Sequence, residues 1–386
     1  MRDAVVCAAV RTPVGRRKGG LAGVHAVDLS ATVLTALIER TGLDPALVDD
    51  VIWGCVSQVG EQTSNIGRVA LLAAGWPESV PGTTVDRQCG SSQQAVAFAA
   101  AAVVSGQADV VVAGGVESMS RVPMGSSAGD GSSGQPLGPA FLARYGGAAP
   151  HQGTGAEMIA ARWGFSRTQL DEFALGSHER AGKAQADGAF DGQLVPVPTP
   201  DGGVVTADEG IRSGGTLERL AALPTPFQAD GVISAGNASQ ISDGAAALLV
   251  TTSERARQLG LTPIVRVHTT VVTGDDPVIM LTAPIPATRK LLDRAGVGLA
   301  EIGVFEVNEA FASVPLAWLA ETGADPKLLN PLGGAIALGH PLGASGARIM
   351  TTLVHHMLGT GTRYGLQTMC EGGGMANATL LELVAG

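Results

Sequence analysis

Several side chains capable of chemistry stand in turns beside apolar or alanine-rich segments. The first is Cys89, in a Gly/Ser-rich turn directly before the stretch 93–104, which contains no glycine or proline. That stretch predicts a helix, and the positive end of a helix dipole stabilises a thiolate, which predicts a lowered pKa for the Cys89 thiol. Many cysteines are simply small buried apolar residues, so position alone leaves a reactive role and a packing role equally open.

Two further candidates lie near the C-terminus. His340 occupies the turn Gly339–Gly343, where an imidazole can accept a proton from a thiol or donate to a carbonyl oxygen; a structural turn histidine is the alternative. Cys370 follows a predicted strand at 364–369 and precedes the glycines 372–374. The bare backbone N–H groups of these glycines suit either an oxyanion hole or a closely packed turn.

The pair Asn308-Glu309 follows the apolar run 304–307. The carboxyl ends of strands are where open α/β sheets place ligand sites, which makes this pair a fourth candidate. The alternative is that the pair caps a helix beginning near Ala310.

The elements that must position these residues alternate along the chain. Runs at 5–9 and 51–56 predict strands, and runs at 29–40 and 66–74 have helical spacing. Such βαβα alternation is typical of an α/β fold with buried sheets, which we expect to be mainly parallel.

A turn, a helix and a strand follow one another twice. Cys89 precedes the helix 93–104 and the strand 110–113, while His340 precedes a helix at 346–358 and the strand that ends before Cys370. This recurrence indicates an internal duplication in which Cys89 and His340 occupy corresponding turns.

The segment between the two units differs in character. It is rich in Gly, Pro and Ser, and only 155–183 is firmly helical. Ser166 and Gln169 predict a capping box that opens the second of two helices there. An inserted subdomain of this kind often covers a ligand site; a surface excursion without a role is the alternative.

Composition limits the classes of function. The chain has 386 residues, of which 45% are hydrophobic and 16% charged, so a large core is possible. A net charge of −10 argues against a nucleic-acid binder, although a local cationic patch could still hold a polyanionic ligand. No apolar run approaches the ~20 residues that span a bilayer. The N-terminus lacks the layout of a signal peptide.

The four cysteines suit a reducing compartment and show no metal-ligand spacing. Cys7 and Cys55 lie in apolar strands and are predicted to belong to the core. We therefore expect a cytoplasmic protein without a membrane segment.

Taken together, the motifs resemble those of the thiolase family, in the family's order and with family-like spacing. The resemblance covers essentially the whole chain, from Arg11-Thr12-Pro13 onward. The motifs are Cys89-Gly90-Ser91, Gly236-Asn237-Ala238-Ser239 with Asp243-Gly244-Ala245-Ala246, Val307-Asn308-Glu309-Ala310-Phe311, the run Gly333 to Gly343 that contains His340, and Cys370-Glu371-Gly372-Gly373-Gly374.

This resemblance implies a thiolase fold: two similar α/β halves in a five-layered α-β-α-β-α core. Residues 1–117, completed by about 241–262, would form the N-terminal half, and 263–386 the C-terminal half. Residues 118–240 would form a loop subdomain covering the coenzyme A site. The family forms homodimers or homotetramers.

The resemblance also implies roles for the candidates. Cys89 would carry the acyl group, His340 would activate it and donate to a thioester oxygen, and Cys370 would move the proton at the α-carbon. Asn308 would hold a water in one oxyanion hole, and the backbone N–H groups of Cys89 and Gly372 would form the second. The reaction would be Claisen condensation or thiolytic cleavage of 3-ketoacyl-CoA, as in acetyl-CoA acyltransferases and acetyltransferases. It needs no metal or redox cofactor, and coenzyme A thioesters are substrates.

Contacts with coenzyme A follow from the same resemblance. Arg212 would face the nucleotide, while Ser239 and His151 would lie beside the pantetheine. Three apolar residues would wall the tunnel: Phe227, Met280 and Phe311. For Phe227 and Met280, plain core packing is the alternative.

Some positions depart from the commonest family pattern, among them Gln88, Gln152 and Glu371. The runs 88–94 and 370–374 resemble acyl-CoA or steroid-side-chain thiolases of high-GC bacteria. The departures leave the acyl chain length open.

Two other functions compete with this interpretation. Condensing enzymes of the ketosynthase type share the fold but typically pair their cysteine with two histidines, where this chain has Asn308 and Cys370. A catalytically silent lipid- or CoA-binding relative would be expected to lose a cysteine or the histidine, and this chain keeps them all.

Overall fold

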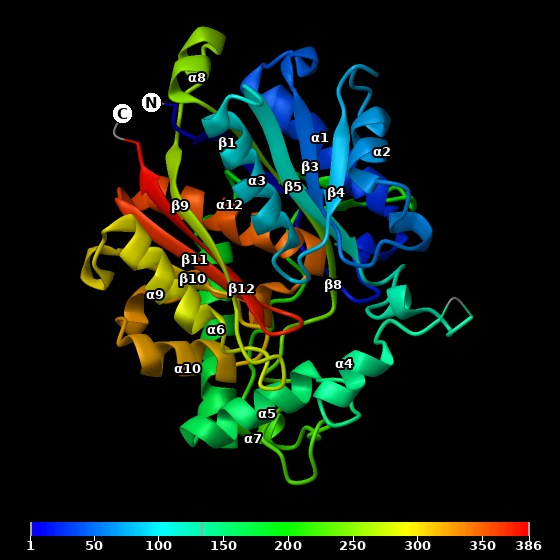
Figure 1. Ribbon diagram of the computed structural model, residues 1–386, viewed down its shortest axis with the longest axis vertical. Helices are drawn as coiled ribbons and strands as arrows, with labels where there is room; N and C mark the ends of the chain where they lie inside the picture. Colours follow the sequence, from blue (N-terminus) through cyan, green and yellow to red (C-terminus); the bar gives the residue numbers. More distant parts are fainter. Residues whose placement is uncertain (1, 133, 385–386) are drawn as a thin grey trace.

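The computed structural model describes residues 2–132 and 134–384. Its main sheet has ten strands in the order β10-β11-β12-β9-β1-β8-β5-β3-β4, with β2 beside β8 (Figure 1). These strands are β1 (Val5–Arg11), β2 (Gly15–Arg16), β3 (Asp50–Gly54), β4 (Gly82–Val85), β5 (Val110–Ser118), β8 (Ser242–Thr251), β9 (Val265–Gly274), β10 (Val304–Val307), β11 (Tyr364–Glu371) and β12 (Met375–Leu383). A separate ribbon pairs β6 (Val197–Pro198) with β7 (Val204–Val205).

The helices cover this sheet on both faces. They are α1 (Ala26–Thr41), α2 (Ile66–Ala73), α3 (Ser91–Ser105), α4 (Pro139–Arg144), α5 (Gln152–Trp163), α6 (Arg167–Ala186), α7 (Leu217–Ala221), α8 (Ser253–Leu259), α9 (Pro284–Ala295), α10 (Ser313–Thr322), α11 (Ala335–Leu338) and α12 (Leu342–Thr360). Every strand and helix expected from the sequence is present, with ends that differ by a few residues.

The two halves of the sheet fold back on each other around α3 and α12. Helices α1 and α2 pack on the outer face of β1, β3, β5 and β8, and α9 packs on the outer face of β9, β11 and β12. Helices α3 and α12 contact each other and strands from both halves. The resulting order is the expected α-β-α-β-α stack, seen in Figure 1 with α12 between the two groups of strands.

The halves of the sheet meet along a very short seam. Strand β1 pairs with β9 only at Val5↔Arg266 and Val6↔Val265. Hydrogen bonds therefore connect all strands of the sheet, but the outer faces of its two halves belong to separate hydrophobic cores. The outer core of the N-terminal half and the outer core of the C-terminal half are separated by the cluster around α3 and α12.

The expectation of mainly parallel sheets is wrong. Only the pairs β3–β4, β3–β5 and β10–β11 are parallel, whereas β1, β8, β9 and β12 all pair antiparallel with their neighbours. Strands buried on both faces are almost continuously apolar whichever way they run, so composition did not reveal their direction.

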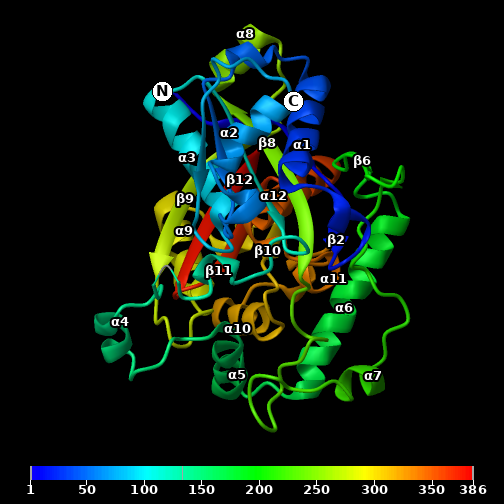
Figure 2. The same cartoon turned by 90° about the vertical axis from the view of Figure 1, so that its right-hand side faces the viewer.

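The insertion between β5 and β8 contributes α4 to α7. Figure 2 places α4, α5 and α7 at one end of the molecule and α6 along its side. The predicted capping box is present: the Ser166 hydroxyl accepts from the Gln169 N–H, and the Gln169 side chain accepts from the Ser166 N–H. The residue boundaries proposed for the three parts stay predictions, and residues 1, 133, 385 and 386 lie outside the described ranges.

Helices α3 and α12 cross at unusually close range. A Cβ atom on Gly346 would lie 2.3 Å from the Gln93 backbone nitrogen. Only glycine permits this approach, which brings the turns at the starts of the two central helices together.

A buried ion pair fastens the insertion to the end of β1. Both Arg11 Nη atoms donate to the Asp208 carboxylate, at 2.7 and 2.9 Å, and neither side chain is exposed. Asp208 also accepts from the Val14 N–H at 2.8 Å. Removing one partner leaves an uncompensated buried charge.

We therefore expect Asp208→Ala to lower the free energy of unfolding by about 3–5 kcal/mol, measured by urea denaturation. The exposed pair Lys183–Asp187 provides the control. Asp187→Ala should cost less than about 1 kcal/mol. Equal effects of the two substitutions would contradict the structural role of the buried pair.

Within the described ranges, the model contains no helix with both the length and the apolar character of a transmembrane span.

Candidate active site

Cys89 lies in a turn that its own neighbours hold in place. The Asp86 carboxylate accepts from the Gln88 N–H at 2.6 Å. The Ser91 hydroxyl accepts from the Arg87 N–H at 2.9 Å and donates to the Gln88 carbonyl at 2.6 Å. Gln88 has a φ of 49°, in the left-handed region that few side chains adopt. The local sequence thus fixes a strained turn that presents Cys89 at the start of α3.

The backbone N–H groups of Cys89 and Gly372 lie near the Cys89 sulfur and lower its pKa. Burial is the larger effect and, with the carboxyl groups of Glu371 and Glu117 nearby, raises the pKa of Cys89 to about 12. The prediction of a lowered pKa is therefore wrong, because desolvation outweighs the helix end. Cys89 is a thiol at neutral pH, and its reaction needs a base.

Cys370 faces Cys89 from the end of β11. Its side chain is fully buried, and both burial and the neighbouring Cys89 sulfur raise its pKa well above the ordinary value. After it the chain turns through Gly373 and Gly374, which have φ values of 83° and 77°. A Cβ on Gly374 would lie 2.7 Å from the Pro277 Cα, so this turn is also closely packed. The close packing suggested for the glycines is present, and their role in an oxyanion hole stays a prediction.

His340 is held at the start of α12 by hydrogen bonds on both ring nitrogens. Nδ1 lies 2.6 Å from the Ser345 hydroxyl, which itself donates to the Pro341 carbonyl at 2.8 Å. Because that hydroxyl proton is already committed, Nδ1 must carry the hydrogen, and Nε2 keeps its lone pair. Nε2 lies 3.4 Å from Asn308 Nδ2.

Burial, assisted by the Arg348 charge, lowers the pKa of His340 to about 3. The imidazole is therefore neutral at physiological pH, with an unprotonated nitrogen turned toward Asn308. That is the protonation state a base needs before it takes a proton.

Asn308 and Glu309 follow β10 but have different surroundings. Asn308 is buried, and its Oδ1 has no hydrogen-bond partner among the residues that the structure describes. Glu309 accepts from Ser177, Asn330 and the Ile336 N–H, so it fastens α6 and α11 to this strand end. The capping alternative is wrong, because α10 begins at Ser313.

A cavity of about 140 Å³ leads to His340 and is mostly apolar. Ser239, Phe227 and Phe311 line it, as predicted, together with Met119, Met124, Gln152, Ala238, Gln240, Ile241, Ala310 and Leu342. A second pocket of about 490 Å³ shares Ser239, Gln240 and Ile241 and contains Arg16, Arg17 and Arg212. The two form a path with an arginine-rich outer part and an apolar inner part.

The two remaining residues predicted to contact coenzyme A, His151 and Met280, lie outside the lining of these two pockets. His151 stacks on Phe227 with ring centroids 5.6 Å apart, and its Nδ1 accepts from the Gly153 N–H at the start of α5. Met280 is buried in the apolar cluster that contains Phe311. Phe227, in contrast, lines the inner pocket. Contact of these three residues with coenzyme A stays a prediction.

Sequence reasoning missed three residues that shape the site. Ser345 fixes the His340 tautomer, and its position in the same turn was a usable signal. Glu117 is the penultimate residue of β5, near the strand end where ligand sites gather, and it accepts from the N–H groups of Val56, Ser57 and Gly343. Glu117 therefore couples the start of α12 to the N-terminal half. The third residue is Glu371, whose carboxyl group contributes to the raised pKa of Cys89.

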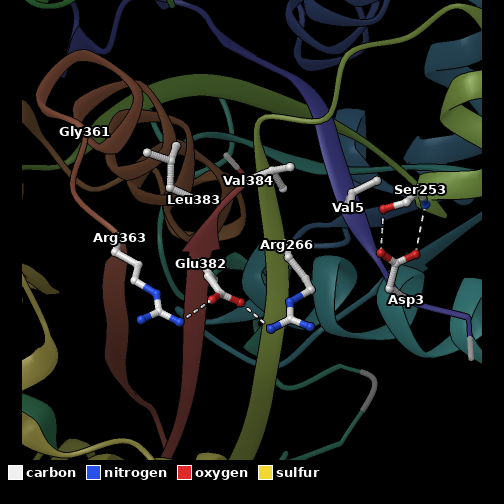
Figure 3. Close-up of a pocket in the computed structure, with 9 residues that line it drawn as sticks. All are labelled: Asp3, Val5, Ser253, Arg266, Gly361, Arg363, Glu382, Leu383 and Val384. Carbon is white, nitrogen blue, oxygen red and sulfur yellow. Dashed lines mark hydrogen bonds and ion pairs between the residues drawn. The ribbon is translucent and has the colours of Figure 1, made fainter. Parts of the chain in front are cut away.

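A surface groove lined by Asp3, Arg266 and Glu382 has a different character. Figure 3 shows Glu382 bridging Arg266 and Arg363, and Asp3 bonded to Ser253. Each of its charged groups thus has a polar partner within the groove, and the lining of this groove shares no residue with that of the cavity at His340.

Comparison with known proteins decides the family. The thiolase N-terminal domain model matches residues 4–254, and the thiolase C-terminal domain model matches 261–383. The chain belongs to the thiolase family. As an enzyme of this family it transfers acyl groups between coenzyme A thioesters by making or breaking a carbon–carbon bond. The resemblance and the fold expected from the sequence are confirmed, and the ketosynthase and silent-binder alternatives are not favoured.

Three relatives illustrate the similarity. The chain is 50% identical to a steroid 3-ketoacyl-CoA thiolase of Mycobacterium tuberculosis, over 99% of this chain and 94% of that protein. It is 44% identical to a β-ketoadipyl-CoA thiolase of Escherichia coli, over 100% of both. The crystal structure of the Bacillus anthracis acetyl-CoA acetyltransferase matches with a TM-score of 0.91 and 38% identity, covering 100% of this chain and 99% of that one.

Proposed function

We propose that this thiolase cleaves 3-ketoacyl-CoA substrates larger than acetoacetyl-CoA, with Cys89, His340, Cys370 and Asn308 as its catalytic residues. The supporting observation is the position of His340 at the inner end of an apolar cavity whose outer part carries arginines. The relatives named as 3-ketoacyl-CoA and β-ketoadipyl-CoA thiolases agree with this substrate class.

In the first half-reaction, the Cys89 sulfur attacks the 3-keto carbon and His340 Nε2 takes the thiol proton. The C2–C3 bond then breaks, its electron pair passes to C2, and Cys370 gives its proton to that carbon. Acetyl-CoA leaves, and the shortened acyl group stays on Cys89. The high pKa of both thiols explains why neither is spontaneously ionised and why a neutral imidazole is required.

In the second half-reaction, the thiol of free coenzyme A gives its proton to Cys370 and attacks the acyl-Cys89 thioester. The Cys89 thiolate leaves and recovers its proton from His340, so the enzyme is restored. The backbone N–H groups of Cys89 and Gly372 would hold one oxyanion, and a water on Asn308 with His340 the other. This chemistry requires no metal or redox cofactor.

The outer pocket is proposed to hold the nucleotide end of coenzyme A. Arg212 is exposed there beside Arg16 and Arg17, which the sequence analysis had not selected. Three guanidinium groups suit a phosphorylated ligand even though the whole chain carries a net charge of −10. Ser239 lies where the outer and inner parts meet, the position expected for pantetheine.

We also propose that the chain forms at least a homodimer and works in the cytoplasm. Strand β4 ends the sheet, and Phe98 and Val104 on the adjoining α3 are each 45% exposed. An open strand edge beside exposed apolar side chains favours association of two copies.

A series of 3-ketoacyl-CoA substrates tests the proposal. We expect thiolysis with kcat/KM at least about tenfold higher for 3-ketooctanoyl-CoA than for acetoacetyl-CoA, because each buried CH₂ adds about 0.8 kcal/mol. Thiolysis is measured as the loss of absorbance of the enolate form of the 3-ketoacyl-CoA substrate, or as the formation of the acyl-CoA product. A preference for acetoacetyl-CoA would instead assign the enzyme to the acetyltransferases, and absence of thiolysis throughout would overturn the proposed activity.

A further inference from the structure

Glu371 is a buried carboxyl group without a visible partner. It ends β11, directly after Cys370, and its side chain is fully buried. Neither Oε1 nor Oε2 has a hydrogen-bond partner among the described residues. Buried acidic groups are ordinarily paired or hydrogen-bonded, so a position like this one needs a physical explanation.

The carboxyl group packs directly beneath the turn that carries Cys89. A Cβ atom on Gly90 would lie 2.0 Å from Glu371 Oε1 and 2.6 Å from Asn377 Nδ2. Asn377 Nδ2 also donates to the Gly90 carbonyl at 3.0 Å. Glu371 and Asn377 therefore support the backbone of the residue that follows Cys89, and only glycine at position 90 leaves room for them.

Few charged groups face this carboxyl. Asp86 and Arg87 belong to the same turn as Cys89, and Cys370 adjoins Glu371 on its own strand. Arg87 makes no ion pair within 4.0 Å in the part of the chain described, and its Nε is buried without a partner. Glu371 thus lacks a neutralising contact, and both reacting sulfurs are close enough to feel its charge.

We propose that Glu371 is a positioning residue of the thiolase reaction: its carboxyl group supports Gly90 from below, and its protonation state controls how readily Cys89 ionises. In the protonated form the carboxyl is neutral and leaves the sulfur free to give its proton to His340. In the ionised form it opposes the charge that develops on Cys89. The inference rests on the proposed function, because it assigns a role in that same site.

The shift in the pKa of Glu371 agrees with the buried, unpaired position of its carboxyl group. Burial, reinforced by Asp86 and opposed by Arg87, raises the pKa of Glu371 to about 8. The carboxyl is consequently neutral at pH 7 and becomes charged on the alkaline side. Above about pH 8, the rate at which Cys89 reacts should therefore rise less steeply with pH than the rate of an isolated thiol does.

Alkylation of Cys89 by iodoacetamide, followed by peptide mass spectrometry between pH 6 and 10, tests this without any substrate. Glu371→Gln keeps the shape and removes the charge. We expect it to be alkylated about tenfold faster than wild type at pH 9, equivalent to about one pKa unit, and to match wild type within about twofold at pH 6. Glu382→Gln, whose carboxylate is paired with Arg266 and Arg363, should follow wild type throughout.

A second variant protects the test against a folding defect. Glu371→Met is also uncharged and of similar length, and it should show the same acceleration at pH 9. An alkylation profile within about twofold of wild type at every pH for both folded variants would leave Glu371 as a packing residue and overturn the proposal. Because alkylation needs no coenzyme A, failure of thiolysis in the wild-type enzyme would refute the proposed function separately.

Thermal unfolding supplies an independent readout. An acid whose pKa is raised in the folded state loses its proton first in the unfolded chain, so stability falls as pH rises from about 4.5 to about 8. Wild type should thus lose more Tm between pH 6 and pH 9 than Glu371→Gln does. An identical loss in both would contradict a buried, titrating carboxyl.

Discussion

Alanine in place of Cys370 is expected to leave Cys89 able to accept an acetyl group from acetyl-CoA while thiolysis and condensation fall by at least about 10²-fold. Acyl transfer to Cys89 needs a nucleophile and an oxyanion hole but no proton exchange at the α-carbon. Cleavage must return a proton to C2, and condensation must remove one. Cys370 is near enough to Cys89 for that sulfur to raise its pKa, and it is the group proposed for that step.

Acetylation is measured by mass spectrometry of the peptide that contains Cys89, and turnover is measured with a 3-ketoacyl-CoA substrate. Cys370→Ser is the near-isosteric companion, because a hydroxyl is a far weaker acid than a thiol and leaves the Gly372 turn supported. Cys89→Ala should lose both acetylation and turnover. Full thiolysis by both Cys370 variants would show that Cys370 is a packing residue.

His340→Ala is expected to have the larger effect, lowering kcat/KM by about 10⁴-fold. The imidazole is proposed both to take the Cys89 proton and to donate to an oxyanion, and each contribution is worth about 10²-fold or more. Two structural features suit the His340 imidazole to these roles: it is neutral, and Ser345 fixes its hydrogen on Nδ1. Single-turnover acylation and steady-state thiolysis should both collapse.

His356→Ala provides the matched control, since His356 lies on the same helix α12 but outside the site. It should retain activity within about twofold of wild type. If His340→Ala stayed within about tenfold of wild type, an interval of ~1.4 kcal/mol, His340 would have to be a structural turn residue.

Local sequence patterns were enough to predict many of the helices and strands and the positions of the reactive side chains along them. Helix α3 follows from an alanine-rich run, and α6 begins at the capping box of Ser166 and Gln169. These features depend on residues a few positions apart, so a linear pattern contains them. The order of the five motifs along the chain likewise indicates the thiolase family.

Only the tertiary structure decided how those elements face one another. The direction of the strands was misjudged because a strand buried on both faces, such as β8, is largely apolar whether it runs parallel or antiparallel to its neighbours. The path to the site likewise needed the structure, since Arg16 and Arg17 meet Arg212 only when the insertion folds over β2.

The charge state of the site was also beyond the sequence. Position at a helix start predicted an acidic thiol at Cys89, yet desolvation and two distant carboxyl groups, Glu117 and Glu371, raise its pKa. Glu371 reaches Gly90 from a strand 281 positions further along the chain. A local sequence pattern indicates which groups can react. The protonation state of each group depends on burial and on remote segments, because every residue around the group contributes to its desolvation.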